Sequence, residues 1–339
     1  MIKPAARGAA VVAGSAALLA AAAVLAMAYG AVRIPLAEVV RALAGAGTDE
    51  TAIRIVRAVR LPRTVMGACV GALLGVSGAV MQGFLANPLA EPYVLGISSG
   101  AALAVALAVL GGAPLFVAGV YVLPFAAFAG ALATLAVVYA LARAGGRVKA
   151  PTLILAGVVV GSFLSACLMA AATAMDRRYF EILSWLMGHL QPATAGTDRW
   201  VAAYAVIGIG AAMACARDLN ALQLGEEAAA AMGVGAETAV RRLFVLSSLL
   251  TAVAVAAAGP IGFVGLVAPH AARLLGGPDH RWLLPASAFG GGALILLADL
   301  AGRMVFAPAE LPVGVVTALL GGPFFLFLLV RQTRRTGAP

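Results

Sequence analysis

Residues Arg60 to Ala101 read RLPRTVMGACVGALLGVSGAVMQGFLANPLAEPYVLGISSGA, and this stretch decides the fold. Its first half, from Thr64 to Ala86, has no charged side chain and is just long enough to cross a hydrocarbon core about 30 Å thick as a helix. Glycines recur at three- or four-residue spacing along it, at Gly67, Gly71, Gly75 and Gly78. One helix face therefore has almost no side chains and can lie flush against a neighbouring helix. The sequence predicts a membrane span that packs tightly inside a bundle.

The span ends in the hexapeptide NPLAEP, residues 87–92. Pro88 and Pro92 forbid a continuous helix here, and Asn87 and Glu91 are polar. Non-helical backbone at membrane depth is tolerated only where protein or water surrounds it. We therefore expect a turn that is buried in protein and does not face lipid.

The composition indicates a polytopic membrane protein. Hydrophobic residues make up 63% of the 339 residues and charged residues only 11%, against about 25% in soluble domains. About ten spans of about 20 residues would leave short loops and no room for a soluble domain, so we expect a single all-α transmembrane domain over residues 1–339, surrounded by lipid. The net charge of +9 places basic residues beside spans and does not indicate a nucleic-acid partner.

Hydropathy and charge also predict the topology. The apolar run 9–30 is longer than a signal-peptide core, which favours an uncleaved first helix with a cytoplasmic N-terminus, although Ala26-Met27-Ala28 would suit a signal peptidase. Segment 31–63 is then external and segment 217–242 cytoplasmic. Six arginines in the external segment break the positive-inside rule. The remaining expected spans are 64–86, 93–111, 115–142, 151–174, 200–216, 242–258, 261–275, 282–302 and 312–330.

Residues able to bind metal or nucleotide are sparse. Cys69, Cys167 and Cys215 sit in apolar runs without metal-ligand spacing, so they predict neither a metal site nor disulfides. His189 and His270 suit a polar residue satisfied inside the bundle, and contact with a metal or haem substrate is the alternative. His280 is expected at the cytoplasmic surface. The chain has no phosphate-binding GxxxxGK[ST] loop, so ATP hydrolysis is expected on another subunit.

Several blocks of the sequence resemble the FecCD-type permeases, which are membrane subunits of ABC importers for iron-siderophores, haem and cobalamin. The first block is RLPRT at 60–64, the glycine-rich span, NPLAEP and LGISSG at 95–100. Two later blocks are GPIGFVGLVAPHAAR at 259–273 and, from Asp299 to Thr317, the segment containing ELPVGVVT. The signature residues are Asn87, Pro88, Pro92, Gly96, Pro269 and His270. Helix packing and turn chemistry alone could explain any one block.

The resemblance implies a type II ABC importer permease in the inner (plasma) membrane of a bacterium or archaeon. The chain would form a homodimer that works with two cytoplasmic ATPase subunits and an external substrate-binding protein. It would hold no cofactor itself, because ATP-Mg binds the ATPase. The substrate would be a bulky metal chelate, namely an iron-siderophore, haem or cobalamin, and the sequence does not choose between them.

The resemblance also assigns roles to particular residues. Arg60, Arg63 and Arg303 would receive acidic residues of the binding protein, with anchoring of helix ends at the headgroups as the alternative. The fifth span would line the path and its gate, through Pro151, Thr152, Gly157 and Gly161.

The cytoplasmic segment 222–235 is expected to form a short helix, with acids in its first turn and Gly233 or Gly235 at its end. It resembles the family's coupling helix, which docks on the ATPase. A solvated connector is the other reading, but exposed Leu222, Leu224 and Met232 would need a partner. The expected contact residues are Leu222, Leu224, Gly225, Glu226, Glu227, Met232 and Gly233.

A weak internal repeat relates Gly78 to Gly259, Pro88 to Pro269 and Gly96 to Gly277 at an offset of 181, which predicts two halves of inverted orientation. Two rival functions remain at this stage. A secondary carrier or channel acting without an ATPase would need intramembrane ion-coupling carboxylates, which are scarce. A membrane scaffold would transport nothing.

Overall fold

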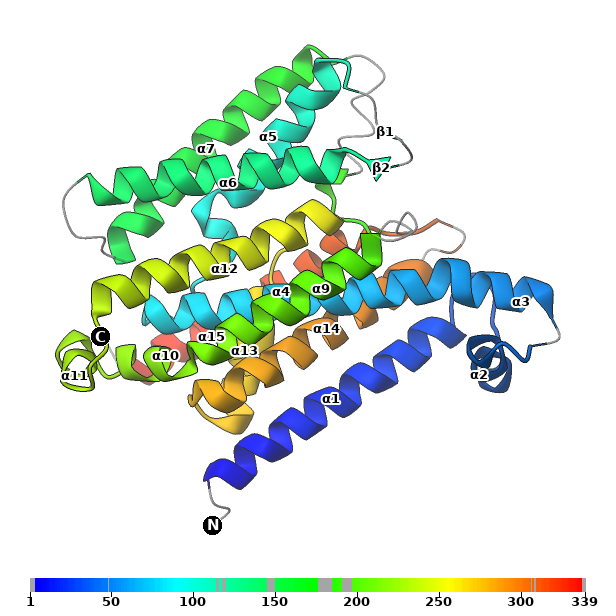
Figure 1. Ribbon diagram of the computed structural model, residues 1–339, viewed down its shortest axis with the longest axis horizontal. Helices are drawn as coiled ribbons and strands as arrows, with labels where there is room; N and C mark the ends of the chain where they lie inside the picture. Colours follow the sequence, from blue (N-terminus) through cyan, green and yellow to red (C-terminus); the bar gives the residue numbers. More distant parts are fainter. Residues whose placement is uncertain are drawn as a thin grey trace.

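The computed structural model describes residues 4–47, 49–113, 116–117, 120–144, 150–175, 185–190, 197–305, 307 and 309–336. The described chain is a bundle of helices with one short hairpin (Figure 1). Its elements are α1 (Pro4–Ala28), α2 (Leu36–Ala44), α3 (Glu50–Arg54), the π-helical turn η1 (Ile55–Arg60), α4 (Leu61–Phe84), the 3-10 turn η2 (Pro92–Leu95), α5 (Ile97–Leu110), β1 (Phe116–Val117), β2 (Val120–Tyr121), α6 (Leu123–Arg143), α7 (Ala150–Thr173), α9 (Thr197–Ala214), α10 (Ala216–Leu222), α11 (Glu226–Ala231), α12 (Ala236–Ala258), α13 (Val264–Gly276), α14 (His280–Val305) and α15 (Val313–Thr336).

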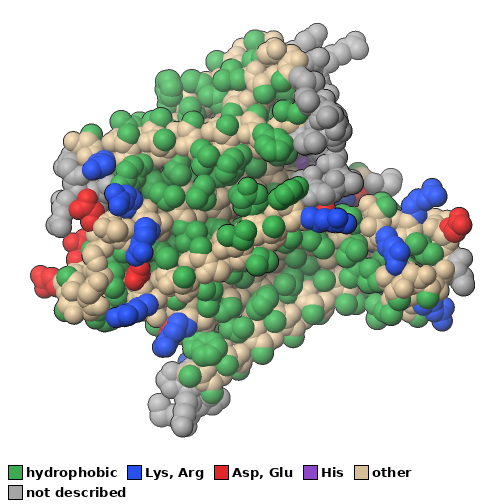
Figure 2. All heavy atoms as spheres, in the orientation of Figure 1, with side chains coloured by type: hydrophobic (Ala, Val, Ile, Leu, Met, Phe, Trp, Pro, Cys, Tyr) green, Lys and Arg blue, Asp and Glu red, His purple; other side chains and the backbone are tan. Residues whose placement is uncertain are grey.

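The helices are arranged around α4, as Figure 1 shows. Helices α5, α6 and α7 form one side of the bundle, and α1 runs along the opposite edge. Helices α2 and α3 lie at one end, and α10 and α11 lie at the other. Figure 2 shows hydrophobic side chains over the middle of the visible face, with most charged side chains gathered toward these two ends. An apolar belt between charged ends is what a bilayer requires.

In the described part of the chain, six helices are long and apolar enough to cross a membrane, and a seventh span is formed if the pair α9 and α10, bent by 48°, is counted as one. A helix lies in each of the segments expected from the sequence, so the all-α transmembrane fold is confirmed. Helix α5 has 14 residues and α13 has 13, which at about 1.5 Å per residue is too short to span about 30 Å. Helix α5 is short because the turn at residues 87–92 and η2 precede it within the bundle.

The glycine face of α4 is confirmed as the central packing surface. A Cβ atom added at Gly71 would overlap the carbonyl oxygen of Gly291, and one at Gly75 would overlap that of Ser287, both on α14. A Cβ atom at Gly78 would overlap the carbonyl oxygen of Gly265 on α13. Backbone therefore touches backbone along this face, which gains dispersion contacts that lipid cannot replace.

The opposite side of α4 is joined to α12 by hydroxyl groups. Ser77 is fully buried and its hydroxyl donates to the carbonyl oxygen of Ser247 at 2.6 Å. The hydroxyl of Thr251 lies 2.7 Å from the same Ser77 oxygen. These contacts satisfy polar groups at a depth where no water competes, so they orient α12 against α4.

Segment 31–63, predicted to be external, differs from the polar connector that the sequence predicted. It contains α2, α3 and η1, and α3, η1 and α4 form a single helical run of 35 residues from Glu50 to Phe84. At about 1.5 Å per residue this run is about 52 Å long, which exceeds the hydrocarbon core by about 20 Å. The sequence prediction placed the helix start at Thr64 because six arginines lower the hydropathy, but a helix continuing beyond the core can carry charge.

Two of the three residue pairs of the proposed internal repeat occupy different settings. Gly78 lies inside α4, whereas Gly259 ends α12 with a φ of 72°. Pro88 lies in the turn after α4, whereas Pro269 lies inside α13. Only the third pair is alike, because Gly96 follows η2 with a φ of 72° and Gly277 follows α13 with a φ of 96°. The inverted repeat therefore stays a prediction.

We expect Gly78→Leu to prevent stable folding, because the side chain has no space between α4 and the Gly265 carbonyl. Overpacking a core position typically costs about 1–3 kcal/mol, and clashing with backbone costs more. Gly14→Leu on α1 is the matched control, because nothing lies within 4 Å of a Cβ atom there. Fluorescence-detected size exclusion of both variants would measure the difference. A monodisperse Gly78→Leu protein with wild-type yield would contradict the assigned packing.

Candidate functional site

The arginines singled out in the sequence gather at the α2–α3 end of the bundle, around one buried carboxylate. Asp299 on α14 is only 2% exposed. Arg63 donates to its Oδ1 atom through Nε at 3.0 Å and Nη2 at 2.8 Å. Arg303, one helical turn beyond Asp299, places its Nε atom 3.0 Å from Oδ2. One buried carboxylate thus contacts two guanidinium groups, and Glu310 supplies a second carboxylate to Arg63. Buried charges require such paired partners.

Arg60 takes no part in this carboxylate pairing. It is buried and donates to the carbonyl oxygens of Met27 and Val32, which fixes the end of α1 and the following loop. Arg303 also donates to the carbonyl oxygens of Tyr29 at 3.3 Å and Ala26 at 3.4 Å. The cluster therefore joins α1, α4 and α14 at one point.

Among the described residues, this cluster is open at the edge formed by Glu310. Glu310 is 47% exposed at its side chain and accepts from Arg63 Nη2 at 2.9 Å. Arg60 and Arg303 face inward and already hold partners. An incoming carboxylate would reach Arg63 from the side of Glu310. The docking role expected for Arg60, Arg63 and Arg303 stays a prediction, and Arg63 is the member of the three that this geometry leaves accessible.

The role of Asp299 as the shared partner of Arg63 and Arg303 was not predicted from the sequence. Asp299 and Arg303 are four residues apart on one helix, which is the spacing of a helical ion pair and the available local signal. The pairing with Arg63, 236 residues away, depends on how α4 and α14 pack.

The opposite end carries the segment 217–242, built as two short helices where one was expected. Helix α10 ends at Leu222, Gly225 turns the chain with a φ of 100°, and α11 begins at Glu226. Glu226 and Glu227 lie in the first turn of α11, as predicted from the helix dipole. Gly233 follows the helix with a φ of 78°, which confirms it as the stop.

The apolar side chains of this segment are divided between core and surface. Leu224 is 69% exposed and Met232 is 41% exposed, as expected. Leu222 is 9% exposed and belongs to the main core, so its predicted exposure is wrong. Leu222 is buried because it lies at the end of α10, which packs against α4 and α14.

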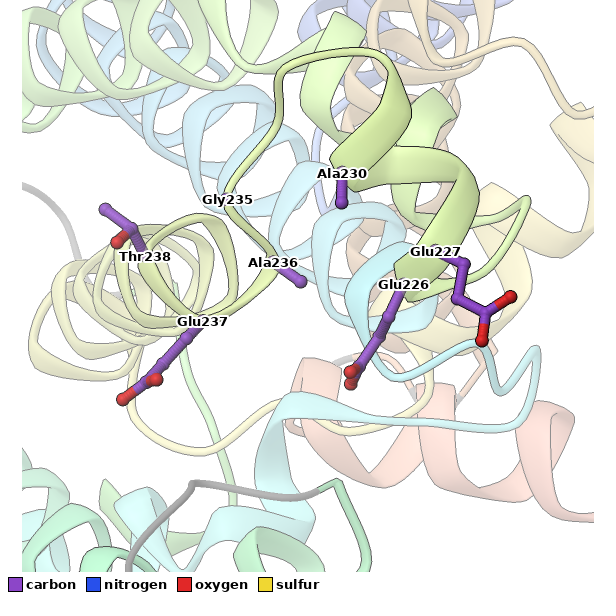
Figure 3. Close-up of a pocket in the computed structure, with 7 residues that line it drawn as sticks. All are labelled: Glu226, Glu227, Ala230, Gly235, Ala236, Glu237 and Thr238. Atoms are coloured by element: carbon purple, nitrogen blue, oxygen red, sulfur yellow. The ribbon is translucent and has the colours of Figure 1, made fainter.

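A hollow of about 400 Å³ lies between α11 and the start of α12. Its lining is Glu226, Glu227, Ala230, Gly235, Ala236, Glu237 and Thr238. In Figure 3, Glu226 projects on the side of α11 that faces the hollow, and Glu227 projects away from the hollow. Among the described residues no group of three His, Cys, Asp or Glu side chains could hold a metal ion.

Asn220 connects the segment to α14. Its Nδ2 donates to Asp279 Oδ1 at 2.8 Å, and its Oδ1 accepts from the backbone N–H of His280 at 2.9 Å. Hydrogen bonds from Arg281, and then from Asn220, lower the pKa of Asp279 to about 2, so the carboxylate stays ionised at neutral pH. His280 is fully buried against this amide, with Nδ1 2.9 Å from Asn220 Oδ1. Its predicted surface position is wrong, because α10 covers the start of α14.

The turn after α4 joins the two main motif blocks. Asn87 Oδ1 accepts from the N–H of Leu89 at 2.9 Å and holds the turn. Glu91 accepts from the N–H of Phe263, and Tyr93 accepts from the N–H of Ile261 at 2.8 Å. Phe263 has a φ of 68° and begins α13, so these bonds stabilise a conformation unusual for a side chain of its size.

The other signature residues serve this junction. Pro92 begins η2, and Gly96 adopts a φ of 72° between η2 and α5. Pro269 lies inside α13, and the ring of His270 packs edge-on against Phe324 at 6.2 Å between centroids. Pro88 is exposed at the turn, so the turn is only partly buried. His189, whose backbone N–H bonds to Ala258 at 2.9 Å, lies far along the chain from His270.

The residues expected at the path and gate divide between two faces of α7. Pro151 and Thr152 are exposed near its start. Gly157 and Gly161 are buried, because η2 and Gly96 pack directly on them. The exposed side of α7 carries large apolar residues and two serines, namely Leu155, Val158, Val159, Ser162, Phe163 and Ser165.

Known proteins resemble the chain over most of its length. The FecCD transport family matches residues 18–331. The cobalamin import system permease protein BtuC of Halobacterium salinarum is 46% identical over 288 residues, covering 84% of this chain and 75% of that one. The hemin transport system permease protein HmuU of Yersinia pestis is 41% identical over 296 residues, covering 86% and 88%.

A solved structure described as an inward-facing metal-chelate type ABC transporter has a TM-score of 0.81 and 29% identity, covering 95% of this chain and 99% of that one. Fold and comparisons together define a type II ABC importer permease, a membrane-spanning transport component. The chain belongs to the FecCD transport family.

We expect Asp299→Ala to destabilise the protein strongly, because it leaves Arg63 and Arg303 without their shared carboxylate. Removing one partner of a buried ion pair costs about 3–5 kcal/mol. Glu310→Ala is the matched control, because it removes only the exposed partner of Arg63 and should cost about 0–1 kcal/mol. Thermal unfolding in detergent would compare them. Equal losses in both variants would show that Asp299 is not the centre of the cluster.

Proposed function

We propose that this chain is the permease subunit of an ATP-driven importer that moves a bulky metal chelate, such as haem, cobalamin or an iron-siderophore, across the inner membrane of a bacterium or archaeon. Family membership over residues 18–331 carries this proposal. The names of the relatives refer to cobalamin, hemin and iron(3+)-hydroxamate, which are all metal chelates too large for a narrow pore.

The cytoplasmic end supports coupling to a separate ATPase that binds ATP-Mg. Exposed Leu224 and Met232 flank α11, whose Glu226 lines the hollow together with Glu237 at the start of α12. Exposed apolar side chains next to an acidic cleft fit a protein partner that supplies both apolar and basic groups. Movement of this unit would pass through Asn220 to α14 and from there to α4, which packs on α14 along its glycine face.

The far side of the bundle supports a homodimer. Helix α7 exposes Leu155, Val159 and Phe163 on the side opposite α1. Two copies meeting on this face would enclose a path between their α7 helices, with Pro151 and Thr152 near one mouth. Two ATPase subunits would then bind at one end and one binding protein at the other, near Arg63.

Transport should require ATP and not an ion gradient. In liposomes containing the permease, its ATPase and its binding protein, we expect ATP on the ATPase side to drive uptake of labelled hemin, cobalamin or a ferric hydroxamate. Uptake should persist with ionophores present, because Asp299 is already paired with two arginines. Uptake that follows an ion gradient without ATP would establish a secondary carrier, and no uptake of any chelate would favour a scaffold.

The ATPase contact should depend on the exposed residues of the coupling segment. We expect Leu224→Glu with Met232→Glu to abolish co-purification of the ATPase while the permease remains monodisperse, because such contact residues contribute about 2 kcal/mol or more each. Deleting residues 222–233 would be a poor test, since Leu222 and Ala229 belong to the core. Ala44→Glu, exposed at the opposite end, is the matched control. Retained ATPase in the double variant would overturn the coupling role.

A further inference from the structure

Helix α2 has an apolar arc that the protein covers only in part. Val39 and Ala42 are buried against the bundle. Leu36, Val40 and Leu43 are 51%, 59% and 36% exposed. Their spacing of four and three residues places them in a single stripe along the helix, next to the buried face. The arc thus continues from the protein core to the surface without a polar boundary.

The stripe is held outward by a rigid support. Arg57 on η1 donates to the carbonyl oxygens of Ala42 at 2.6 Å and Leu43 at 2.8 Å, which caps the C-terminal end of α2. Gly45 ends the helix with a φ of 81°. Beneath α2 lies a small core of its own, made of Ala28, Ile34, Val39, Ala42, Ala52 and Val56. Helix α2 therefore cannot turn its stripe inward without breaking these contacts.

The position of α2 matches the edge of a bilayer. Helix α1 is an apolar span of 24 residues ending at Ala28, about 36 Å long, so its end lies at the boundary of a core about 30 Å thick. The N–H of Ile34 bonds to the carbonyl oxygen of Ala28 at 3.0 Å, which ties the start of α2 to that boundary. In Figure 1, α2 is seen end-on beside the end of α1, so it crosses the direction of the spanning helices.

The surroundings of the stripe suit lipid. Near the same end of α1, Val24 and Leu25 are 39% and 40% exposed, and Tyr29, which follows the helix, is 37% exposed. Apolar side chains that suit hydrocarbon therefore occur close to α2 along the chain. Arg33 places its guanidinium 5.7 Å from the centre of the Tyr29 ring. Tyrosine and arginine are the side chains that anchor at headgroups, one by its amphipathic ring and the other by binding phosphate.

We propose that α2 is an interfacial helix whose stripe, defined as Leu36, Val40 and Leu43, lies in the phospholipid surface at the end of the bundle opposite α11. The lipid covers the exposed half of the apolar arc, and the protein core covers the other half. Since Arg57 joins α2 to η1, the membrane surface also sets the height of the helical run that leads to Arg63 and its cluster.

Site-directed nitroxide labelling of the complete permease in phospholipid vesicles tests this inference. Single cysteines at Leu36, Val40 and Leu43 would be labelled in a background in which the three native cysteines are replaced by alanine. We expect high collision rates with oxygen and low rates with a water-soluble nickel chelate at all three positions. Ala37 and Arg41, exposed on the other side of α2, are the matched controls and should show the reverse. A stripe as accessible to the nickel chelate as Ala37 and Arg41 would overturn the proposal.

Two further measurements identify any other occupant. Loss of oxygen access at the stripe only on adding the substrate-binding protein would assign the surface to that protein and overturn the lipid assignment. Dipolar coupling between nitroxides at Val40 in two copies would assign it to a second copy of the chain. We expect neither the loss of oxygen access nor the dipolar coupling. Either result would concern only what covers α2, so it would not change the outcome of the ATP-dependent uptake experiment.

Discussion

The close contact between α4 and its neighbours is the constraint on which the rest of the structure depends. Gly71 and Gly75 meet the backbone of α14, and Gly78 meets that of α13, with no side chain between them. Within a bilayer apolar side chains gain little by leaving lipid, so close backbone packing and hydrogen bonds must hold the bundle together. Residues at both ends of α4 then have fixed partners on α13 and α14.

Those partners connect the two ends of the molecule through one pair of helices. At one end Arg63 before the span binds Asp299 near the end of α14. At the other end Gln82 accepts from Arg273 at 2.9 Å, and Asn220 bonds to the start of α14. A tilt of α14 at its Asn220 end would therefore be felt at the arginine cluster. This continuity gives a physical route by which an ATPase and an external protein can act on the same permease.

Three exposed apolar surfaces, on α2, around α11 and on α7, differ in their surroundings. The stripe on α2 lies where α1 leaves the hydrocarbon, whereas Leu224 and Met232 lie beyond the spans beside a cleft with carboxylates. The apolar side of α7 lies across the bundle from α1. Each surface is apolar, but its depth and its neighbouring charges distinguish the proposed lipid surface, the proposed ATPase contact and the proposed face between copies.

The sequence by itself determined which segments form the apolar helices, the glycine face of α4, the break at residues 87–92 and the acidic start and glycine end of α11, because hydropathy, missing side chains, proline and glycine act locally. Only the tertiary structure decided that Arg63 shares Asp299 with Arg303, that His280 and Leu222 are buried, and that α2 presents its stripe outward. Each of these depends on which side of a helix meets which neighbour far along the chain. A local pattern leaves that rotation open, and close packing of the helices settles it.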